Sequence, residues 1–205
     1  AIDPNNDHVI ILTLTNAFDA GQVNVTYADP TLGNDSIAIQ DLAGNDMTSF
    51  FSGQVVDGYI RGAEISIAVI DPVTHAEILI STGVTTNAQG NFFLPNVLPD
   101  GSPMPQGALV ISGGVNIDTG LPNTTVLRAP AGATVINPLT TMVDAIVGAG
   151  GASDPAAIAA ASAKVAASLG IPAGTDLTSY DPMAVLSDPN ADPADRKSTR
   201  LNSSH

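Results

Sequence analysis

The sequence predicts a mainly β protein, an antiparallel β-sandwich followed by a helical segment of two or three helices. Apolar and polar residues alternate along several short stretches, which is the period of a half-buried strand. Asp, Asn and Gly turns separate these stretches, and near residue 137 the apolar spacing becomes helical. The 205 residues, 44% of them hydrophobic, are enough for one or two domains with a sizeable core. This composition excludes a disordered chain, and the lack of cysteine excludes a disulfide framework.

The first 53 residues contain two strand-like stretches, VIILTLT and VNVTYAD, joined by a turn. A long loop rich in Asp, Asn and Gly follows them and leads into MTSFF, a further strand. The stretch LTLTNAFDAGQVNVTYADPTLGNDSIAIQDLAGND resembles the carboxyl half of the SwmB-type immunoglobulin-like repeat of large bacterial surface proteins. The resemblance implies that residues 1–53 are a truncated immunoglobulin-like module of a longer repeat protein.

Residues 54–130 continue the strand pattern. VVDGYIRGAEISIAVI alternates up to a turn at Asp71-Pro72, and AEILIST follows as the return strand. A second turn is expected just before Gly90, which would take a positive φ angle there. ALVISGG and TVLRA supply further strands, with a turn at 120–123 between them. We expect an antiparallel sandwich over 55–129 that encloses the side chains of Leu79, Phe92, Leu94, Leu109 and Ile111.

Two groups of residues in this span resemble the prealbumin-like sandwich of the carboxypeptidase regulatory family. The first is the pattern D-G-x-I-x-G-A at residues 57–63, and the second is the set Thr86, Gly90, Phe92, Leu94 and Asn96. The resemblance implies that the glycines permit tight hairpins and that the aromatic ring fills the gap between two sheets. The predicted fold is therefore an immunoglobulin-like or prealbumin-like antiparallel β-sandwich with a helical segment after it.

The helical segment is predicted to begin at Asn137, which caps a helix with Pro138 at its first position. Asp154-Pro155 repeats this start signal for an Ala-rich helix that ends at Gly170, and Asp181-Pro182 starts a third helix. The first two helices should pair as an antiparallel hairpin, because the connection between them is short. The first helix should bury one apolar stripe, formed by Leu139, Met142, Val143, Ile146 and Val147.

The chain is thus expected to comprise four segments. These are the partial immunoglobulin-like module at 1–53, the prealbumin-like sandwich at 54–130, a helical appendage at 131–195 and a tail at 196–205. The appendage is similar to helices that follow such sandwiches in long secreted bacterial proteins. The tail, RKSTRLNSSH, differs abruptly in composition from DPNADPAD before it and is interpreted as a non-native extension.

The formal net charge of −14 excludes some classes of partner. Nucleic acids and anionic membranes attract clustered Lys and Arg, and this chain has only 6 basic residues against 20 acidic ones. No apolar run approaches the 18 or so residues of a membrane-spanning helix. The expected partners are neighbouring modules of the same chain and cell-surface or matrix ligands, with no nucleic acid and no membrane insertion.

An enzyme is not predicted. The chain has no cysteine, and neither His8 nor His75 lies in a recognisable nucleophile motif. His75 follows a Pro in an expected hairpin turn and is interpreted as a solvated turn residue. Paired carboxylates do not discriminate a site, because so many Asp residues in turn-rich sequence form close pairs by chance.

Calcium is the one cofactor for which the sequence offers ligands. A hard cation takes oxygens from Asp, Asn and backbone carbonyls of flexible loops. The loop from Asp29 to Asp46 holds several such residues close together in sequence, and the candidate ligands are Asp29, Asp35, Asp41 and Asp46. The same residue types form Asx turns and cap strand ends without a metal, so both interpretations remain open. No other cofactor is predicted.

The predicted function is that of a non-catalytic spacer and presentation module in a secreted or cell-surface, adhesin-like repeat protein of bacteria. An acidic, turn-rich module without cysteine suits a stalk that stays soluble outside the cell. Two alternatives are a calcium-dependent adhesive or carbohydrate-binding module and an accessory domain of a secreted hydrolase. An adjoining catalytic domain would distinguish the hydrolase from the spacer.

Overall fold

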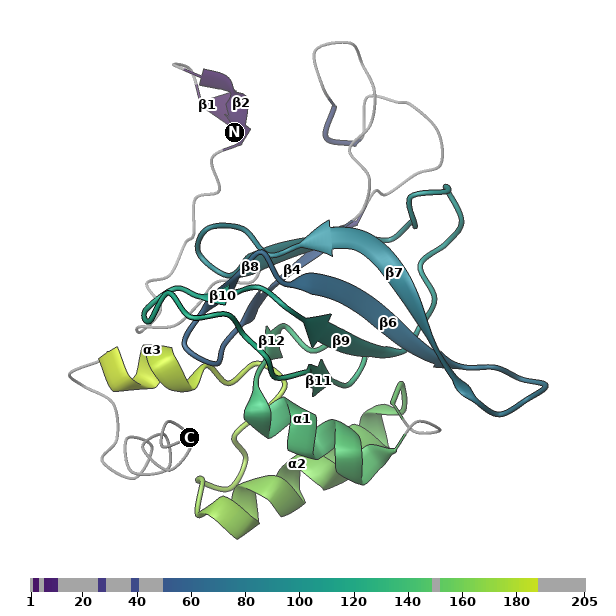
Figure 1. The fold of residues 1–205 in the computed structure, drawn as a ribbon, viewed down its shortest axis with the longest axis vertical. Helices are drawn as coiled ribbons and strands as arrows, with labels where there is room; N and C mark the ends of the chain where they lie inside the picture. Colours follow the sequence, from purple (N-terminus) through teal and green to yellow (C-terminus); the bar gives the residue numbers. More distant parts are fainter. Residues whose placement is uncertain are drawn as a thin grey trace.

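The computed structural model describes residues 2–3, 6–10, 26–28, 38–40, 50–148 and 152–187 (Figure 1). Within these ranges the protein is mainly β, with several antiparallel sheets and three helices. This confirms the predicted class. Most of the described structure follows residue 50, where two sheets lie above the paired helices in the view of Figure 1.

The larger sheet has four strands in the order β11-β9-β6-β7, and all neighbouring strands are antiparallel. Strand β6 is central and long, and its alternating apolar residues place Ile65 and Ile67 on the buried face. The strands of this sheet are β6 (Glu64–Ile70), β7 (Glu77–Thr85), β9 (Ala108–Ser112) and β11 (Leu127–Ala129).

The second sheet is built around strand β4. β3 and β8 pair antiparallel with β4, whereas β12 pairs parallel with it through Val135 and Ile136. The strands of this sheet are β3 (Thr26–Tyr27), β4 (Phe50–Val55), β8 (Asn91–Pro95) and β12 (Val135–Ile136). Two short pairs complete the strands: β1 (Ile2–Asp3) with β2 (Asn6–Ile10), and β5 (Ile60–Arg61) with β10 (Val115–Asn116).

One apolar core joins the two sheets. Phe92 and Leu94 from β8 pack in the same cluster as Leu109 and Ile111 from β9, and all four are buried. Their predicted burial is confirmed. The Phe92 ring lies directly over Gly53 of β4, where a Cβ atom would overlap both the ring and the carbonyl of Thr134. Only glycine leaves room for the aromatic side chain at this crossing.

The prediction for Leu79 is wrong, because this side chain is 56% exposed. Leu79 lies on β7, at the edge of the larger sheet, and Figure 1 shows the β6–β7 hairpin projecting beyond the second sheet. Leu79 pairs with Ala68, which belongs to a separate cluster on the face of the larger sheet that points away from the core between the sheets. Three apolar residues in succession, 78–80, identify a strand but do not show which of them face the second sheet.

The predicted turns at Asp71-Pro72 and before Gly90 are confirmed. The Asp71 carboxylate accepts hydrogen bonds from the N–H groups of Val73 and Thr74 in the β6–β7 turn. These bonds, that from Thr74 above all, lower the pKa of Asp71. His75 is exposed in the same turn with a φ of 55°, and Gly90 has a φ of 81° in the turn before β8. The turn expected at 120–123 lies earlier in the chain, because the Gly120 N–H donates to the Asn116 carbonyl and Pro122 already pairs with Val115.

The helices begin and end close to the predicted residues. α1 (Pro138–Val147) follows Asn137, whose side chain accepts from the Thr140 N–H while the Thr140 hydroxyl accepts from the Asn137 N–H. α2 (Pro155–Leu169) begins after the cap Asp154 and ends at Gly170, which is left-handed. α3 (Pro182–Ser187) follows Asp181. α1 and α2 pack as an antiparallel pair, as predicted (Figure 1).

The predicted stripe of α1 is wrong in part. Leu139 and Val143 are buried against α2, but Met142 is 41% and Ile146 48% exposed. A different side of α1, which includes the polar Thr140 and Asp144, is buried as well. α1 lies against both β11 and α2, so its buried surface extends to polar positions and leaves two apolar ones in solvent.

Candidate functional site

Several side-chain hydrogen bonds and ion pairs join the larger sheet to the helices. The centre of this junction is Arg128 on β11, at the edge of that sheet. Thr141 Oγ1 accepts from the Arg128 N–H at 2.9 Å, and the Thr140 and Thr141 hydroxyls donate to the Arg128 carbonyl at 2.9 and 3.1 Å. Two side chains of α1 therefore satisfy the backbone of an edge strand, as a further strand would.

The Arg128 guanidinium joins three elements. Its Nε donates to Asp144 Oδ2 on α1 at 2.7 Å, and its Nη1 and Nη2 donate to the Glu77 carboxylate at 3.1 and 2.7 Å. Glu77 is the first residue of β7, at the opposite edge of the sheet. Burial acts to lower the pKa of Arg128, but the bonds to Glu77 and Asp144 outweigh it and raise that pKa above its usual value. This group is a clamp and not a general base, because Arg stays protonated.

Two further contacts join the segment just before α3 to the rest of the fold. The Tyr59 hydroxyl donates to Asp181 Oδ2 at 3.0 Å, and the Asn137 side-chain amide donates to the Tyr180 carbonyl at 3.0 Å. Burial and the charge of Asp181 raise the pKa of Tyr59 well above 10. Backbone hydrogen bonds also connect the start of β12 to the loop between α2 and α3, since the N–H groups of Thr134 and Val135 both donate to the Thr178 carbonyl.

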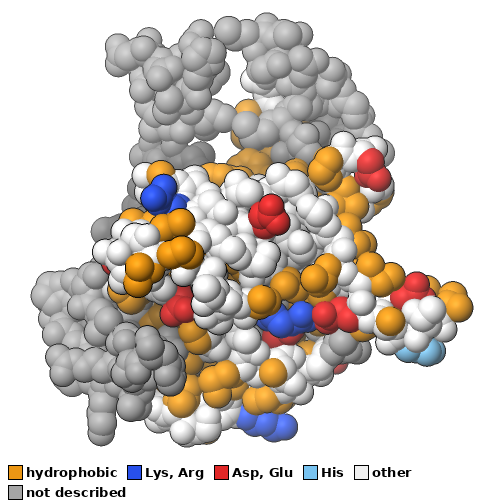
Figure 2. Space-filling model, in the orientation of Figure 1, with side chains coloured by type: hydrophobic (Ala, Val, Ile, Leu, Met, Phe, Trp, Pro, Cys, Tyr) orange, Lys and Arg blue, Asp and Glu red, His pale blue; other side chains and the backbone are white. Residues whose placement is uncertain are grey.

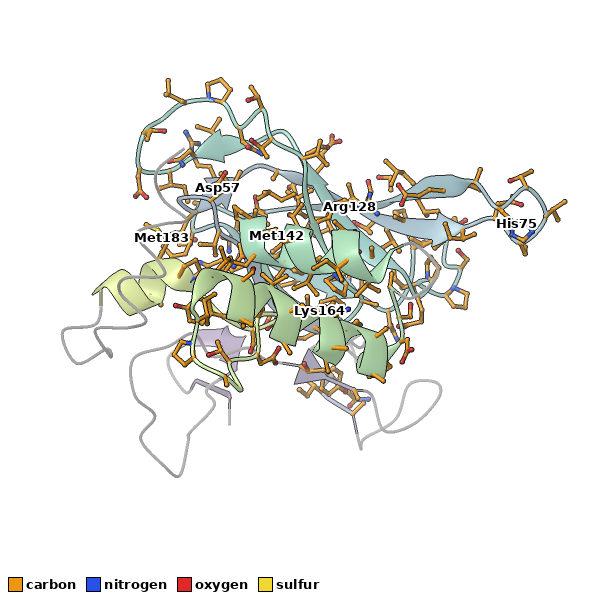
Figure 3. The ribbon with its side chains drawn as sticks, turned by 90° about the horizontal axis from the view of Figure 1, so that it is seen from below. Asp57, His75, Arg128, Met142, Lys164 and Met183 are labelled. Atoms are coloured by element: carbon orange, nitrogen blue, oxygen red, sulfur yellow. The ribbon has the colours of Figure 1, made fainter. Side chains whose placement is uncertain are left out.

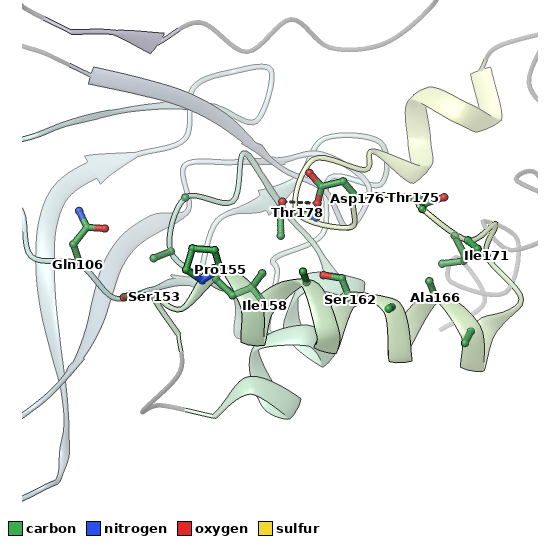
Figure 4. A pocket seen from close by; sticks show the side chains of 17 residues that line it. Gln106, Ser153, Pro155, Ile158, Ser162, Ala166, Ile171, Thr175, Asp176 and Thr178 are labelled. Carbon is green, nitrogen blue, oxygen red and sulfur yellow. Dashed lines mark hydrogen bonds between the residues drawn. The ribbon is translucent and has the colours of Figure 1, made fainter.

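A groove of about 740 Å³ runs along α2 (Figure 4). One wall is a face of α2 that includes Ile158 and Ser162, and the other is the loop from Ile171 to Thr178. Ser162 lines the groove, and its hydroxyl oxygen is enclosed and has no hydrogen-bond partner among the described residues. On the rim, the Asp176 carboxylate accepts from the Thr178 N–H and hydroxyl, which holds the loop closed on itself. The walls of the groove are mostly small apolar side chains, and the Ser162 hydroxyl is enclosed among them.

The four predicted calcium ligands, Asp29, Asp35, Asp41 and Asp46, lie outside the described residues, so the calcium prediction stays a prediction. Within residues that the structure describes, no group of three or more His, Asp or Glu side chains could hold a metal ion. His75 lies at the tip of the β6–β7 hairpin, away from the helices (Figure 3). No helix in the described ranges is long and apolar enough to cross a bilayer.

Sequence reasoning missed both Arg128 and Ser162. A signal existed for Arg128, because a charged residue inside the apolar strand TVLRA requires a partner when it is covered. Ser162 had no such signal, because serine in an Ala-rich helix most often faces water. Its burial depends on the loop after Gly170, which returns over the helix.

Comparisons with known proteins found no similar protein: no family model, no curated protein and no solved structure matches this chain.

Proposed function

We propose that this chain is a non-catalytic spacer and presentation module of a large secreted or cell-surface, adhesin-like bacterial repeat protein. The observation that supports it best is the clamp at Arg128, which ties α1 to both edges of the larger sheet. A spacer must hold its two ends in a constant relative position. Separate packing units usually move relative to each other unless their interface is extensive and well bonded.

The charge and the resemblances support the same proposal. A formal charge of −14 keeps neighbouring modules soluble and apart. The residues that resemble the carboxypeptidase regulatory family include Phe92 and Leu94, which lie in the core between the two sheets. We extend the proposal to an immunoglobulin-like or prealbumin-like sandwich and to neighbouring modules of the same chain as its partners.

A replacement experiment in the parent protein tests the spacer role. Residues 50–187 are deleted from the full reading frame and, in a second version, replaced by an unrelated rigid domain of similar length. An epitope beyond this segment reports how far the chain reaches from the cell surface. We expect the deletion to make the epitope inaccessible to antibody and the replacement to restore it. If the unrelated domain fails to restore accessibility although it is expressed, the spacer role is wrong.

A second candidate function, an adhesive or carbohydrate-binding module, is favoured by the buried hydroxyl of Ser162. An unbonded polar group at this depth costs about 1–3 kcal/mol, and a ligand that moves the walls around the Ser162 hydroxyl apart would recover this cost by hydrogen bonding to it. Binding of the full chain to a panel of uncharged oligosaccharides tests this candidate. Ala163→Trp should block the groove from its rim, and Lys164→Gln, outside the groove, is the matched control. Absence of binding by the unchanged chain contradicts it.

A further inference from the structure

The two edges of the larger sheet differ in whether their backbone groups have partners. At the β11 edge, hydroxyls of α1 bond the backbone of Arg128, as described above. At the other edge, β7 is nine residues long and no described strand pairs with its outer side. An uncovered strand edge is a row of N–H and C=O groups, and only water or another extended strand can satisfy them in a regular way.

The hairpin geometry shows which backbone groups face outward. The Asp71 N–H donates to the Ala76 carbonyl at 2.9 Å and closes the β6–β7 turn. Hydrogen-bonded and non-hydrogen-bonded pairs alternate along an antiparallel ladder, so Ile78 and Ile80 bond to β6. The N–H and C=O groups of Glu77, Leu79 and Ser81 therefore point away from β6, toward the open edge.

The side chains along this edge do not protect it. Protected edges usually carry lysine, proline or an inward-pointing charge. β7 contains neither lysine nor proline. Its one charged residue, Glu77, is paired with Arg128. Ile78 and Leu79 are 43% and 56% exposed. Figure 2 shows hydrophobic side chains on the projecting hairpin, whose tip carries His75. A bulge at residues 82–83 interrupts the ladder with β6, so the regular part of the edge that can accept a strand is residues 77–81.

We propose that β7 pairs antiparallel with β7 of a second copy of this chain, about a two-fold axis at Leu79. In this register Leu79 lies opposite Leu79 of the second copy, Ile78 opposite Ile80, and Glu77 opposite Ser81. The outward backbone groups of one edge then meet those of the other, and no like charges face each other. The register is self-complementary, as a two-fold contact requires.

The covered β11 edge makes this a closed assembly. The larger sheet of each copy has one open edge, so two copies join into a single eight-stranded sheet that leaves no open edge of this sheet for a third copy. An open filament would need both edges free. This inference does not depend on the spacer role, because it concerns only the free edge of β7.

Sedimentation velocity of the full 205-residue chain, from low to high micromolar concentration, tests the proposal. We expect a concentration-dependent equilibrium between monomer and dimer. Leu79→Lys, which places a charge at the two-fold axis, should weaken the dimer by about tenfold or more. Ser81→Pro, which removes one outward N–H, should weaken it in the same direction. Leu121→Lys is the matched control, because Leu121 is 65% exposed in the loop after β10, outside the larger sheet, and should not alter the equilibrium.

Hydrogen exchange locates the contact independently of the variants. The amides of Leu79 and Ser81 should exchange more slowly as protein concentration rises, while amides in the hairpin turn stay unchanged. A chain that is monomeric at every concentration overturns the proposal. So does a dimer that Leu79→Lys, shown by circular dichroism to be folded, leaves intact. Concentration-independent protection of the edge also overturns it, because the occupant would then belong to the same chain.

Discussion

The hydroxyl of Tyr59 donates a hydrogen bond to Oδ2 of Asp181 at 3.0 Å, across 122 residues of chain. The other oxygen of the same carboxylate accepts from the N–H groups of Met183 and Ala184 at the start of α3. One buried carboxylate therefore starts the third helix and attaches it to the strands. The direction in which α3 leaves the sheets depends on this contact.

Tyr59→Phe should lower the free energy of unfolding by about 1.5–3 kcal/mol, because a hydrogen bond to a charged acceptor is lost. The effect should depend on pH. The pKa of Tyr59 is raised in the folded protein, by burial first and by Asp181 second, so its contribution is complete below the unfolded pKa of about 10. Above pH 10 the unfolded tyrosine ionises and the contribution falls.

Urea unfolding of both proteins at pH 7 to 11 measures this difference. The gap between the unchanged chain and Tyr59→Phe should be constant up to about pH 9 and should narrow above pH 10. If the difference in unfolding free energy widened as the pH rose, the raised pKa of Tyr59 in the folded protein would be contradicted.

Replacement of Arg128 should be among the most destabilising changes at the junction. Arg128→Met leaves Asp144, whose side chain is only 7% exposed, without its partner, and such a loss costs about 3–5 kcal/mol. Glu77→Gln should cost less than about 1 kcal/mol, because the Glu77 side chain is partly exposed. Chemical denaturation of both variants checks the order. If both variants lost the same free energy of unfolding, the buried ion pair between Arg128 and Asp144 would not be the main contribution of Arg128.

Phe92→Ala should cost about 3–5 kcal/mol, since a completely buried ring is removed from the core between the sheets. Phe93→Ala is the matched control, because the neighbouring ring is 54% exposed. The control should cost markedly less. Thermal or urea unfolding distinguishes the two, and a cost below about 1 kcal/mol for Phe92→Ala would contradict its place in the core.

Two neighbouring residues of α1 should respond differently to an added charge. Val143→Asp should cost several kcal/mol, because Val143 is fully buried between α1 and α2. Met142→Asp should cost less than about 1 kcal/mol, because its carboxylate reaches water. Melting temperatures of the two variants give the comparison. A large loss for Met142→Asp would mean that another surface covers this side of α1.

Millimolar calcium should raise the melting temperature of a complete first module if the Asp29–Asp46 loop binds the ion. Binding to the folded state alone adds about 2.7 kcal/mol when calcium exceeds its Kd a hundredfold. Magnesium should help much less, because it demands octahedral geometry and loses water reluctantly. Asp35→Asn and Asp41→Asn should reduce the calcium shift. An equal shift with magnesium would indicate general screening of the −14 charge.

Local patterns in the sequence determined most of the elements. Alternation in EISIAVI specifies a strand, and the start signals at Asn137 and Asp154 specify helices, because strand period and helix caps depend on residues near each other in the chain. The burial of Phe92 together with Leu94 was also predictable, since residues two apart in a strand share one face.

Only the tertiary structure decided which surfaces are covered and which polar groups meet. Leu79 and Met142 have sequence patterns typical of buried residues, yet both are exposed, because burial depends on the reach of a neighbour encoded elsewhere. Arg128 forms ion pairs with Glu77, 51 residues away in the sequence, and with Asp144, 16 residues away. The open edge of β7 has the same origin: a strand's own residues specify its conformation, but its neighbours come from distant parts of the chain.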